Sequence, residues 1–323
     1  MKIIKVEDAV GTVLCHDMTQ IIKDGFKGPR FRKGHVIKQE DIPVLLDMGK
    51  DHIYVFECGD DQYHENDAAL HLAEICKGNN TFSGDIVEGK ISIFSQCDGV
   101  LKIDIDLLNK INGITDIMIA TKYNNTPVKK NNIIAGTRVI PLVVAKSTIE
   151  RAEKTAGSKK IIQVLPYKGL RAGIVTTGNE VYYGRIKDQF TDVIRNKIKA
   201  FEITEIGHRY SKDPLEEIEV HIKELIDEGA NIIFCSGGMS VDPDDNTPGA
   251  IKAVATDIVT YGAPVLPGAM FMLAYYNDIP IIGLPGCVMF SKQTVFDLVL
   301  PRLAAGEKVT KQEIVALGNG GLL

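Results

Sequence analysis

Through the second half of the chain, short apolar runs alternate with longer stretches in which apolar side chains recur every three or four residues. Short apolar runs are typical of buried strands, and the longer period is typical of helices with one buried face. Strands are predicted at Ala172–Thr176, Glu202–Gly207, Ile232–Cys235 and Ile279–Leu284, and helices at Thr191–Phe201, after Asp213, from Pro248 and over about Val288–Ala304. This alternation predicts the α/β class, with a mostly parallel C-terminal sheet covered by helices on both faces.

The first half has a different pattern, in which short strands meet at polar turns such as Asp98-Gly99. Strands are predicted at Ile91–Phe94, Val100–Ile103, Asp116–Ala120, Ile133–Ala135 and Val139–Val144, and helices at Glu40–Met48, Asn66–Cys76 and Thr148–Ala156. This pattern predicts a mixed α+β N-terminal region. We place the domain boundary near Tyr167-Lys168-Gly169, which gives a region 1–168, with a subdivision near residue 60 left open, and an α/β domain 169–323.

Two of the predicted helices carry capping signals at their starts. Asp213 with Glu216 has the spacing of a capping box, and Gly229 is placed to end the same helix. Ser147 with Glu150 repeats the capping-box spacing in the first half of the chain. These signals predict helix starts at residues 213 and 147.

Residues 236–249 form the most informative polar segment. A buried strand leads into Gly237-Gly238, three carboxylates follow at Asp242, Asp244 and Asp245, and Thr247-Pro248 begins a helix. A glycine turn between a strand and a helix start binds oxyanions through its backbone amides. Three carboxylates beside a phosphate would repel it unless a hard cation lay between them. The segment therefore predicts a phosphorylated ligand held with Mg²⁺, and a solvated acidic turn that caps the next helix is the alternative.

Three glycine-containing turns follow predicted strands of the second half, at Thr177-Gly178, Gly237-Gly238 and Pro285-Gly286. Ligands of parallel α/β sheets bind outside the carboxyl ends of the strands. We therefore expect these three turns to surround one binding site.

Composition excludes several classes of function. A formal net charge of −5 with no long basic run gives no electrostatic surface for nucleic acid. No run of 18 apolar residues occurs, and the first residues lack a secretory signal, so we expect a cytoplasmic protein without a membrane span. The six cysteines are scattered and are expected to be reduced. Cys235 is expected to be a buried, inert thiol, whereas Cys287 lies at a helix start, where a thiolate is favoured.

With these turns in view, the chain resembles the molybdopterin-binding family that includes molybdopterin adenylyltransferases and molybdenum insertases. The matching segments are Thr177-Gly178-Asn179-Glu180, Ser236-Gly237-Gly238, Ser240-Val241 with Asp245 and Thr247, Pro267-Gly268 and Leu284-Pro285-Gly286. They follow the order of the family and span the whole second domain. Each segment alone is common, and the ordered set is specific.

The resemblance implies molybdenum-cofactor biosynthesis, with molybdopterin or its adenylylated form as ligand, Mg²⁺ as cofactor and molybdate as a further substrate. It implies Asp245 and Glu180 as catalytic residues, and Asp242 with Asp245 as the metal ligands. Residues expected to contact the ligand are Thr177, Gly178, Ser236, Gly237, Gly238, Ser240, Thr247, Pro267, Gly268, Pro285 and Gly286. Family members form dimers or trimers, so a homo-oligomer is expected.

The chain departs from the insertase pattern in ways that bear on activity. Asn179 replaces the acid of the insertase Thr-Gly-Asp-Glu signature, and Leu266-Pro267-Gly268-Ala269-Met270 lacks both lysines of Lys-Pro-Gly-Lys-Pro. The Tyr-Asp-Thr-Asn segment is also missing, and Gln189-Phe190-Thr191-Asp192 lies near its place. These differences leave three hypotheses: a molybdenumtransferase of the insertase type, a non-enzymatic pterin-binding or regulatory protein, and an adenylyltransferase or phosphohydrolase of a related nucleotide.

Overall fold

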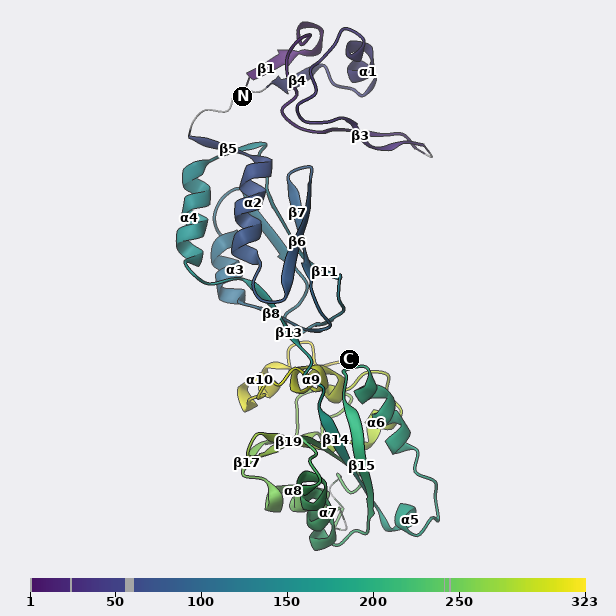
Figure 1. Cartoon of the computed structure of the whole chain (residues 1–323). Coiled ribbons are helices and arrows are strands. Elements are labelled where there is room, and N and C mark those ends of the chain that lie inside the picture. The colour runs from purple at the N-terminus through teal and green to yellow at the C-terminus, as the bar shows by residue number, and fades with distance from the viewer. Residues whose placement is uncertain (1, 24, 56–60, 241, 244) are drawn as a thin grey trace. The chain divides into compact units, whose positions relative to one another are not determined.

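The computed structural model describes residues 2–23, 25–55, 61–240, 242–243 and 245–323, and it separates into two compact units (Figure 1). One unit contains Met1–Cys97 and Leu101–Val164, and the other contains Asp98–Val100 and Leu165–Leu323. The predicted boundary near Tyr167 lies shortly after the start of the long segment of the second unit. The subdivision considered near residue 60 lies outside the described residues.

The second unit is built on a mostly parallel sheet, as the α/β pattern predicts, but the sheet has six strands, of which Asp257–Tyr261 and Met272–Tyr276 were not predicted. Its strands, in order across the sheet, are β15 (Thr204–Ser211), β14 (Arg171–Thr177), β16 (Ile232–Ser236), β19 (Ile279–Leu284), β18 (Met272–Tyr276) and β17 (Asp257–Tyr261). β14 runs parallel to β15 and β16, and β16 runs parallel to β19, whereas β18 and β17 are antiparallel. The sheet is therefore mostly parallel, with an antiparallel edge.

Helices cover both faces of this sheet, because alternate residues of each strand point to opposite sides. Ala172 and Ile174 of β14 pack under α6 (Phe190–Lys199) and α9 (Val295–Ala304). Val175 of the same strand packs under α7 (Leu215–Asp227) and α8 (Thr247–Val254) on the other face (Figure 1). The remaining short helices are α5 (Asn179–Tyr182), η2 (Gly286–Met289) and α10 (Lys311–Ala316).

Three expectations for the second unit were wrong in detail. The predicted helix over Val288–Ala304 is two elements, η2 and α9, because Thr294 is extended and forms a capping box with Asp297 that starts α9. β15 begins at Thr204 rather than Glu202, because Glu202 has a positive φ of 59° in the turn after α6.

The third concerns the start of α7, which begins at Leu215, after Pro214. Asp213 is not its capping residue. The Asp213 carboxylate instead accepts a bond from the Asn179 amide at 3.4 Å.

In the first unit, the described residues include an antiparallel sheet of four strands and three helices longer than seven residues. The strands are β6 (Thr81–Val87), β7 (Lys90–Ser95), β11 (Ile133–Val139) and β9 (Ile117–Thr121), and the helices are α2 (Glu65–Cys76), α3 (Ile105–Asn112) and α4 (Lys146–Ala156). α4 starts after Ala145 without a side-chain cap, so the Ser147 with Glu150 capping box was a wrong prediction. α3, which the sequence pattern did not reveal, starts at Asp104, whose carboxylate accepts a bond from the Leu107 amide at 2.9 Å.

The remaining elements of the chain are short. They are β1 (Lys2–Lys5), η1 (Val6–Asp8), β2 (Met18–Ile21), β3 (Lys27–Phe31), α1 (Asp41–Asp47), β4 (His52–Val55), β5 (Gln62–His64), β8 (Gly99–Ile103), β10 (Pro127–Val128), β12 (Val143–Ala145) and β13 (Ile162–Pro166). Among the described residues, none of the helices is both long and apolar enough to cross a bilayer.

Candidate functional site

The three glycine turns lie at one edge of the parallel part of the sheet. Thr176 of β14 pairs with Ser236 of β16, and Ser236 pairs with Leu284 of β19. The strands therefore end side by side, and the chain leaves them at Gly178, Gly237 and Pro285. This is the edge at which a parallel sheet binds ligands.

The Gly237-Gly238 turn requires glycine at both positions. Their φ angles are +86° and +55°. A Cβ on Gly237 would lie 2.2 Å from the Thr177 carbonyl oxygen, and one on Gly238 would lie 2.9 Å from Thr247 Oγ1. Within the described residues, the amides of Gly238 and Met239 donate to no protein acceptor. The turn therefore presents free N–H groups at the end of β16.

Thr247 holds this turn from behind. Its hydroxyl donates to the Gly237 carbonyl oxygen at 2.8 Å and lies 3.0 Å from Thr177 Oγ1. Thr247 is fully buried. The bonds place the start of α8 directly against the turn.

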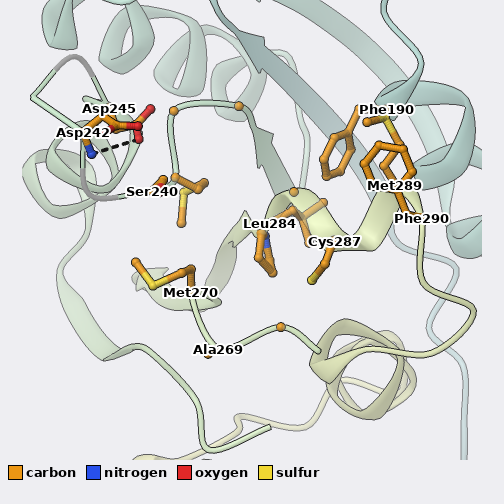
Figure 2. Close-up of a pocket in the computed structure, with 16 residues that line it drawn as sticks. Phe190, Ser240, Asp242, Asp245, Ala269, Met270, Leu284, Cys287, Met289 and Phe290 are labelled. Atoms are coloured by element: carbon orange, nitrogen blue, oxygen red, sulfur yellow. Dashed lines mark hydrogen bonds between the residues drawn. The ribbon is translucent and has the colours of Figure 1, made fainter. Parts of the chain in front are cut away.

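A cavity of about 620 Å³ lies in front of the turn. Figure 2 shows Asp242 and Asp245 on one side of it, Phe190, Met289 and Phe290 on the opposite side, and Ala269 and Met270 on a third. Its lining also includes Gly237, Gly238, Met239, Ser240, Gly268, Leu284, Pro285, Gly286 and Cys287. Apart from the two carboxylates, this cavity, called the large cavity below, is mainly apolar and rich in sulfur.

A second cavity, of about 360 Å³ and called the small cavity below, adjoins the large one. The two share Phe190, Gly237 and Met289 in their linings. The other residues around the small cavity are Thr176, Thr177, Glu180, Val181, Ile186, Lys187, Asp188, Gln189 and Ser236. Its polar groups come from the ends of β14 and β16, from α5 and from the segment before α6.

Asp242 and Asp245 lie together, as the metal-site hypothesis requires. The Asp242 amide donates to Asp245 Oδ2 at 3.3 Å (Figure 2), and the Asp245 amide donates to the Asp242 carbonyl oxygen at 3.0 Å. Neither carboxylate has an ion-pair partner among the described residues. Burial, and then the charge of Asp245, raises the pKa of Tyr261.

The described residues contain no group of three or more His, Cys, Asp or Glu side chains placed to hold a metal. Asp244 lies outside the described residues. Two carboxylates fit Mg²⁺ nevertheless, because this ion is commonly held by one or two carboxylates together with water and ligand phosphate.

Glu180 lines the small cavity, whereas Asp245 lines the large one, so the two predicted catalytic residues lie in different compartments. Glu180 belongs to α5, and its carboxylate lies over the first turn: a Cβ on Gly178 would meet Glu180 Oε1 at 2.7 Å. Within the described residues the Glu180 carboxylate has no ion-pair partner.

The predicted ligand-contacting residues divide into three groups. Ser240, Gly238, Gly268, Pro285 and Gly286 line the large cavity, Thr177 and Ser236 line the small one, and Gly237 lines both. The described lining of neither cavity includes Gly178, Thr247 or Pro267. For all eleven residues, direct ligand contact stays a prediction.

Asp188 and Thr191 join a buried polar cluster that sequence reasoning did not assign to the site. The Asp188 carboxylate accepts bonds from the Phe190 amide at 2.8 Å, the Thr191 amide at 3.1 Å and the Thr191 hydroxyl at 2.5 Å. Thr191 Oγ1 lies 3.1 Å from Thr176 Oγ1, which lies 2.9 Å from His208 Nε2. The usable signal was an Asp placed just before a helix and three residues ahead of a Thr.

The protonation states of this cluster follow from its surroundings. Burial acts to raise the pKa of Asp188, but bonds from Thr191 and Phe190, with the His208 charge, lower it below its usual value. Burial lowers the pKa of His208, and Asp188 only partly opposes this effect. Because the Thr191 proton is given to Asp188, Thr176 must donate to Thr191, and His208 Nε2 must donate to Thr176. The result is an oriented chain of donors that ends at an ionised carboxylate.

The two cysteines of interest differ in position. Cys235 is fully buried in β16, and burial raises the pKa of its thiol to about 12. Cys287 is partly buried in η2 and lines the large cavity, and burial raises the pKa of its thiol as well. Both side chains are therefore neutral thiols near pH 7, and Cys287 adds to the soft, apolar character of the cavity.

Two stretches of the chain match families of known proteins. Residues 173–305 match the family described as "Probable molybdopterin binding domain", and this stretch holds the three glycine turns and most residues of both cavities. Residues 3–57 match a family described as "Domain of unknown function (DUF8806)".

Curated relatives match over a short stretch. CinA-like proteins from Mycolicibacterium vanbaalenii and from Mycobacterium avium are each 36% identical over 78 residues, 24% of this chain. The match spans only 18% of the length of either relative.

Solved structures resemble part of the chain only distantly. The molybdopterin biosynthesis enzyme MoaB from Thermus thermophilus is 21% identical, covers 43% of this chain and 98% of its own, and has a TM-score of 0.38. The protein CinA with unknown function from Thermoplasma acidophilum is 18% identical, covers 37% of this chain and 90% of its own, and has a TM-score of 0.32.

Proposed function

Because residues 173–305 form a domain of the molybdopterin-binding family, we propose that the second unit binds molybdopterin or adenylylated molybdopterin at the carboxyl edge of its sheet. One observation carries the proposal: the glycine turns after β14, β16 and β19 meet around two adjoining cavities. A ligand with two parts joined by phosphate suits two compartments that share Gly237.

The phosphate is proposed to bind at the Gly237-Gly238 turn. The amides of Gly238 and Met239 have no acceptor among the described residues, and the start of α8 lies just behind them. Backbone N–H groups at the end of a strand stabilise an oxyanion without the cost of holding a flexible side chain. The apolar, sulfur-rich walls formed by Met239, Met270 and Cys287 suit the less polar part of the ligand.

Asp242 and Asp245 are proposed to hold Mg²⁺ against that phosphate. Their carboxylates face the large cavity without ion-pair partners among the described residues, so a cation there would offset charge that the protein leaves uncompensated. The metal would neutralise phosphate charge. Asp245 would orient a water molecule, and Glu180 would exchange a proton with the ligand from the small cavity.

We propose a catalysed reaction in addition to binding, and the binding proposal does not depend on it. Molybdenum insertion with release of AMP is the leading reaction, and a regulatory pterin-binding protein and a nucleotide adenylyltransferase or phosphohydrolase are its rivals. The wall at Gly268, Ala269 and Met270 favours the non-enzymatic alternative, because it offers no cation for molybdate.

The test combines binding and turnover in one titration. Purified protein is mixed with molybdopterin or adenylylated molybdopterin, with Mg²⁺ or with EDTA, and binding is followed by pterin fluorescence. Molybdate is then added and AMP is measured. If the protein binds neither molybdopterin nor adenylylated molybdopterin, the proposed function is refuted. Tight binding without AMP supports the non-enzymatic hypothesis. In a separate reaction ATP is added without molybdopterin, and its consumption supports the nucleotide enzyme.

The expectation of an oligomer comes only from the resemblance to the molybdopterin-binding family. A dimer or trimer is proposed for the protein in solution, and light scattering of the purified chain would measure it directly.

A further inference from the structure

Lys187 is the one lysine or arginine in the described lining of the two cavities. It is an exposed residue at the rim of the small cavity. Within the described residues its amine has neither a hydrogen-bond nor an ion-pair partner. A lysine amine without an internal partner at the rim of a binding cavity is available to a ligand.

The backbone of Lys187 is placed by its neighbour. Asp188 accepts three hydrogen bonds from the first residues of α6, and Thr191 continues these bonds to the end of β14. The position of Lys187 is therefore set by the buried cluster, although its own side chain is free to move. The backbone at Lys187 is therefore held beside the small cavity, whose described lining includes this residue.

The charge around the two cavities makes this amine important. The described linings carry four carboxylates, Glu180, Asp188, Asp242 and Asp245, against the one lysine. The oxygens of Asp188 are already occupied by donors from α6. The other three carboxylates would repel a phosphate group, so a bound phosphate needs positive charge from the protein or from a metal.

The side of the large cavity formed by Ala269 and Met270 offers no positive charge in the described lining. Ala269 and Met270 line the large cavity at the positions where the insertase pattern has Lys-Pro. Any lysine contribution from the described lining must therefore come from the side of α6.

We propose that Lys187 is the specificity residue that makes this site prefer the phosphorylated form of its pterin ligand. The inference rests on the proposed function. The amine would donate a charge-assisted hydrogen bond to the ligand phosphate held at the Gly237-Gly238 turn, and this bond compensates the carboxylates nearby.

The experiment compares two ligands that differ only in phosphate, neopterin 3′-phosphate and neopterin. Their dissociation constants are measured by pterin fluorescence for the wild-type chain, Lys187→Met, Lys187→Arg and Arg185→Gln. Arg185 is the matched control, because it loses the same charge two residues away, stacks over the Tyr183 ring at 5.4 Å and is absent from both linings.

We expect the wild-type chain to bind neopterin 3′-phosphate about tenfold more tightly than neopterin, as a hydrogen bond to a charged group implies. Lys187→Met should bring the two dissociation constants close together, because it should weaken the binding of the phosphorylated ligand only. Lys187→Arg and Arg185→Gln should retain the preference, and added salt should reduce it in the wild-type chain.

Four results would count against these statements in different ways. If Lys187→Met keeps the wild-type preference, or if Arg185→Gln loses it equally, the role of Lys187 is refuted while pterin binding stands. An equal loss of affinity for both ligands in Lys187→Met also refutes it, because the residue would then act only on the structure. If the wild-type chain binds neither ligand, the proposed function fails and the inference fails with it.

Discussion

The two compartments of the site use polar residues differently. In the small cavity, Asp188 and Thr176 belong to a continuous buried chain of hydrogen bonds, which also fixes the position of α6. In the large cavity, Asp242 and Asp245 bond only to each other's backbone among the described residues. Satisfied buried networks make a site rigid, whereas carboxylates without partners are available to a cation or ligand. The difference indicates that the small cavity is preformed, whereas the carboxylates of the large cavity are left for the proposed cation or ligand.

The largest expected effect comes from the turn that both compartments share. Gly237→Ala should destabilise the second unit by about 3 kcal/mol or more, because a Cβ there would lie 2.2 Å from the Thr177 carbonyl oxygen. Gly286→Ala is the matched control, since its added Cβ meets nothing within 4 Å and its φ is not positive. Urea unfolding of both variants measures the difference. Equal stabilities would mean that the turn is not held as described.

A second test addresses the carboxylates of the large cavity. Asp245→Asn should weaken Mg²⁺-dependent pterin binding by about tenfold or more, because it removes a charge from the proposed metal site. Folding should be preserved, since among the described residues this side chain has only one weak bond, from the Asp242 amide at 3.3 Å. Binding is compared in Mg²⁺ and in EDTA, with exposed Asp227→Asn as control. If the variant and the wild-type chain respond alike to Mg²⁺, Asp245 does not bind the metal.

A third test breaks the hydrogen-bonded chain of the small cavity. Thr191→Val keeps the shape of the side chain but removes the hydroxyl that connects Asp188 to Thr176. We expect a loss of about 1–3 kcal/mol in the free energy of unfolding, since buried partners are left unsatisfied. On the other face of the sheet, Thr247→Val should cost a similar amount through the Thr177 pair. Urea denaturation checks both, and an unchanged midpoint for Thr191→Val would contradict the assignment.

The smallest expected effect concerns pH. Burial keeps the pKa of His208 below that of an unfolded histidine, so the unfolded chain binds the proton more readily. The stability contribution of neutral His208 is therefore present above about pH 6.5 and is lost as pH falls from there through the folded pKa. His208→Gln should make unfolding less dependent on pH in this window. Part of the dependence should persist, because burial also lowers the pKa of His16 and His64.

Much of the second unit could be predicted because its signals are local. The apolar runs of β14, β16 and β19 and the glycines after them were located from neighbouring residues alone. One error arose where a distant contact decides: Asp213 has the spacing of a cap, yet its carboxylate bonds to the Asn179 amide. Another was a missed local signal, because α9 starts only at Val295, where Thr294 and Asp297 form a capping box.

The candidate site shows the same limit. The Gly237-Gly238 turn and the paired Asp242 and Asp245 were expected to lie together, and they do. Asp188 and Lys187 were not assigned to the site, because their position depends on how α6 packs over the end of β14. Such contacts join residues far apart in the sequence, and no short pattern records them.

By itself, the sequence determined the order of β14, β15, β16 and β19 and of the helices α6, α7, α8 and α9, the three turns at the parallel edge, and the acidic segment beside it, but it did not reveal β17 and β18. These features follow from apolar periodicity and from the backbone freedom of glycine, both of which act over a few residues. Only the tertiary structure decided that the edge holds two compartments sharing Gly237, that Thr247 supports the turn from behind, and that Lys187 lies at the rim. Those facts depend on packing between distant segments, which fixes the position of each side chain only when the whole sheet is assembled.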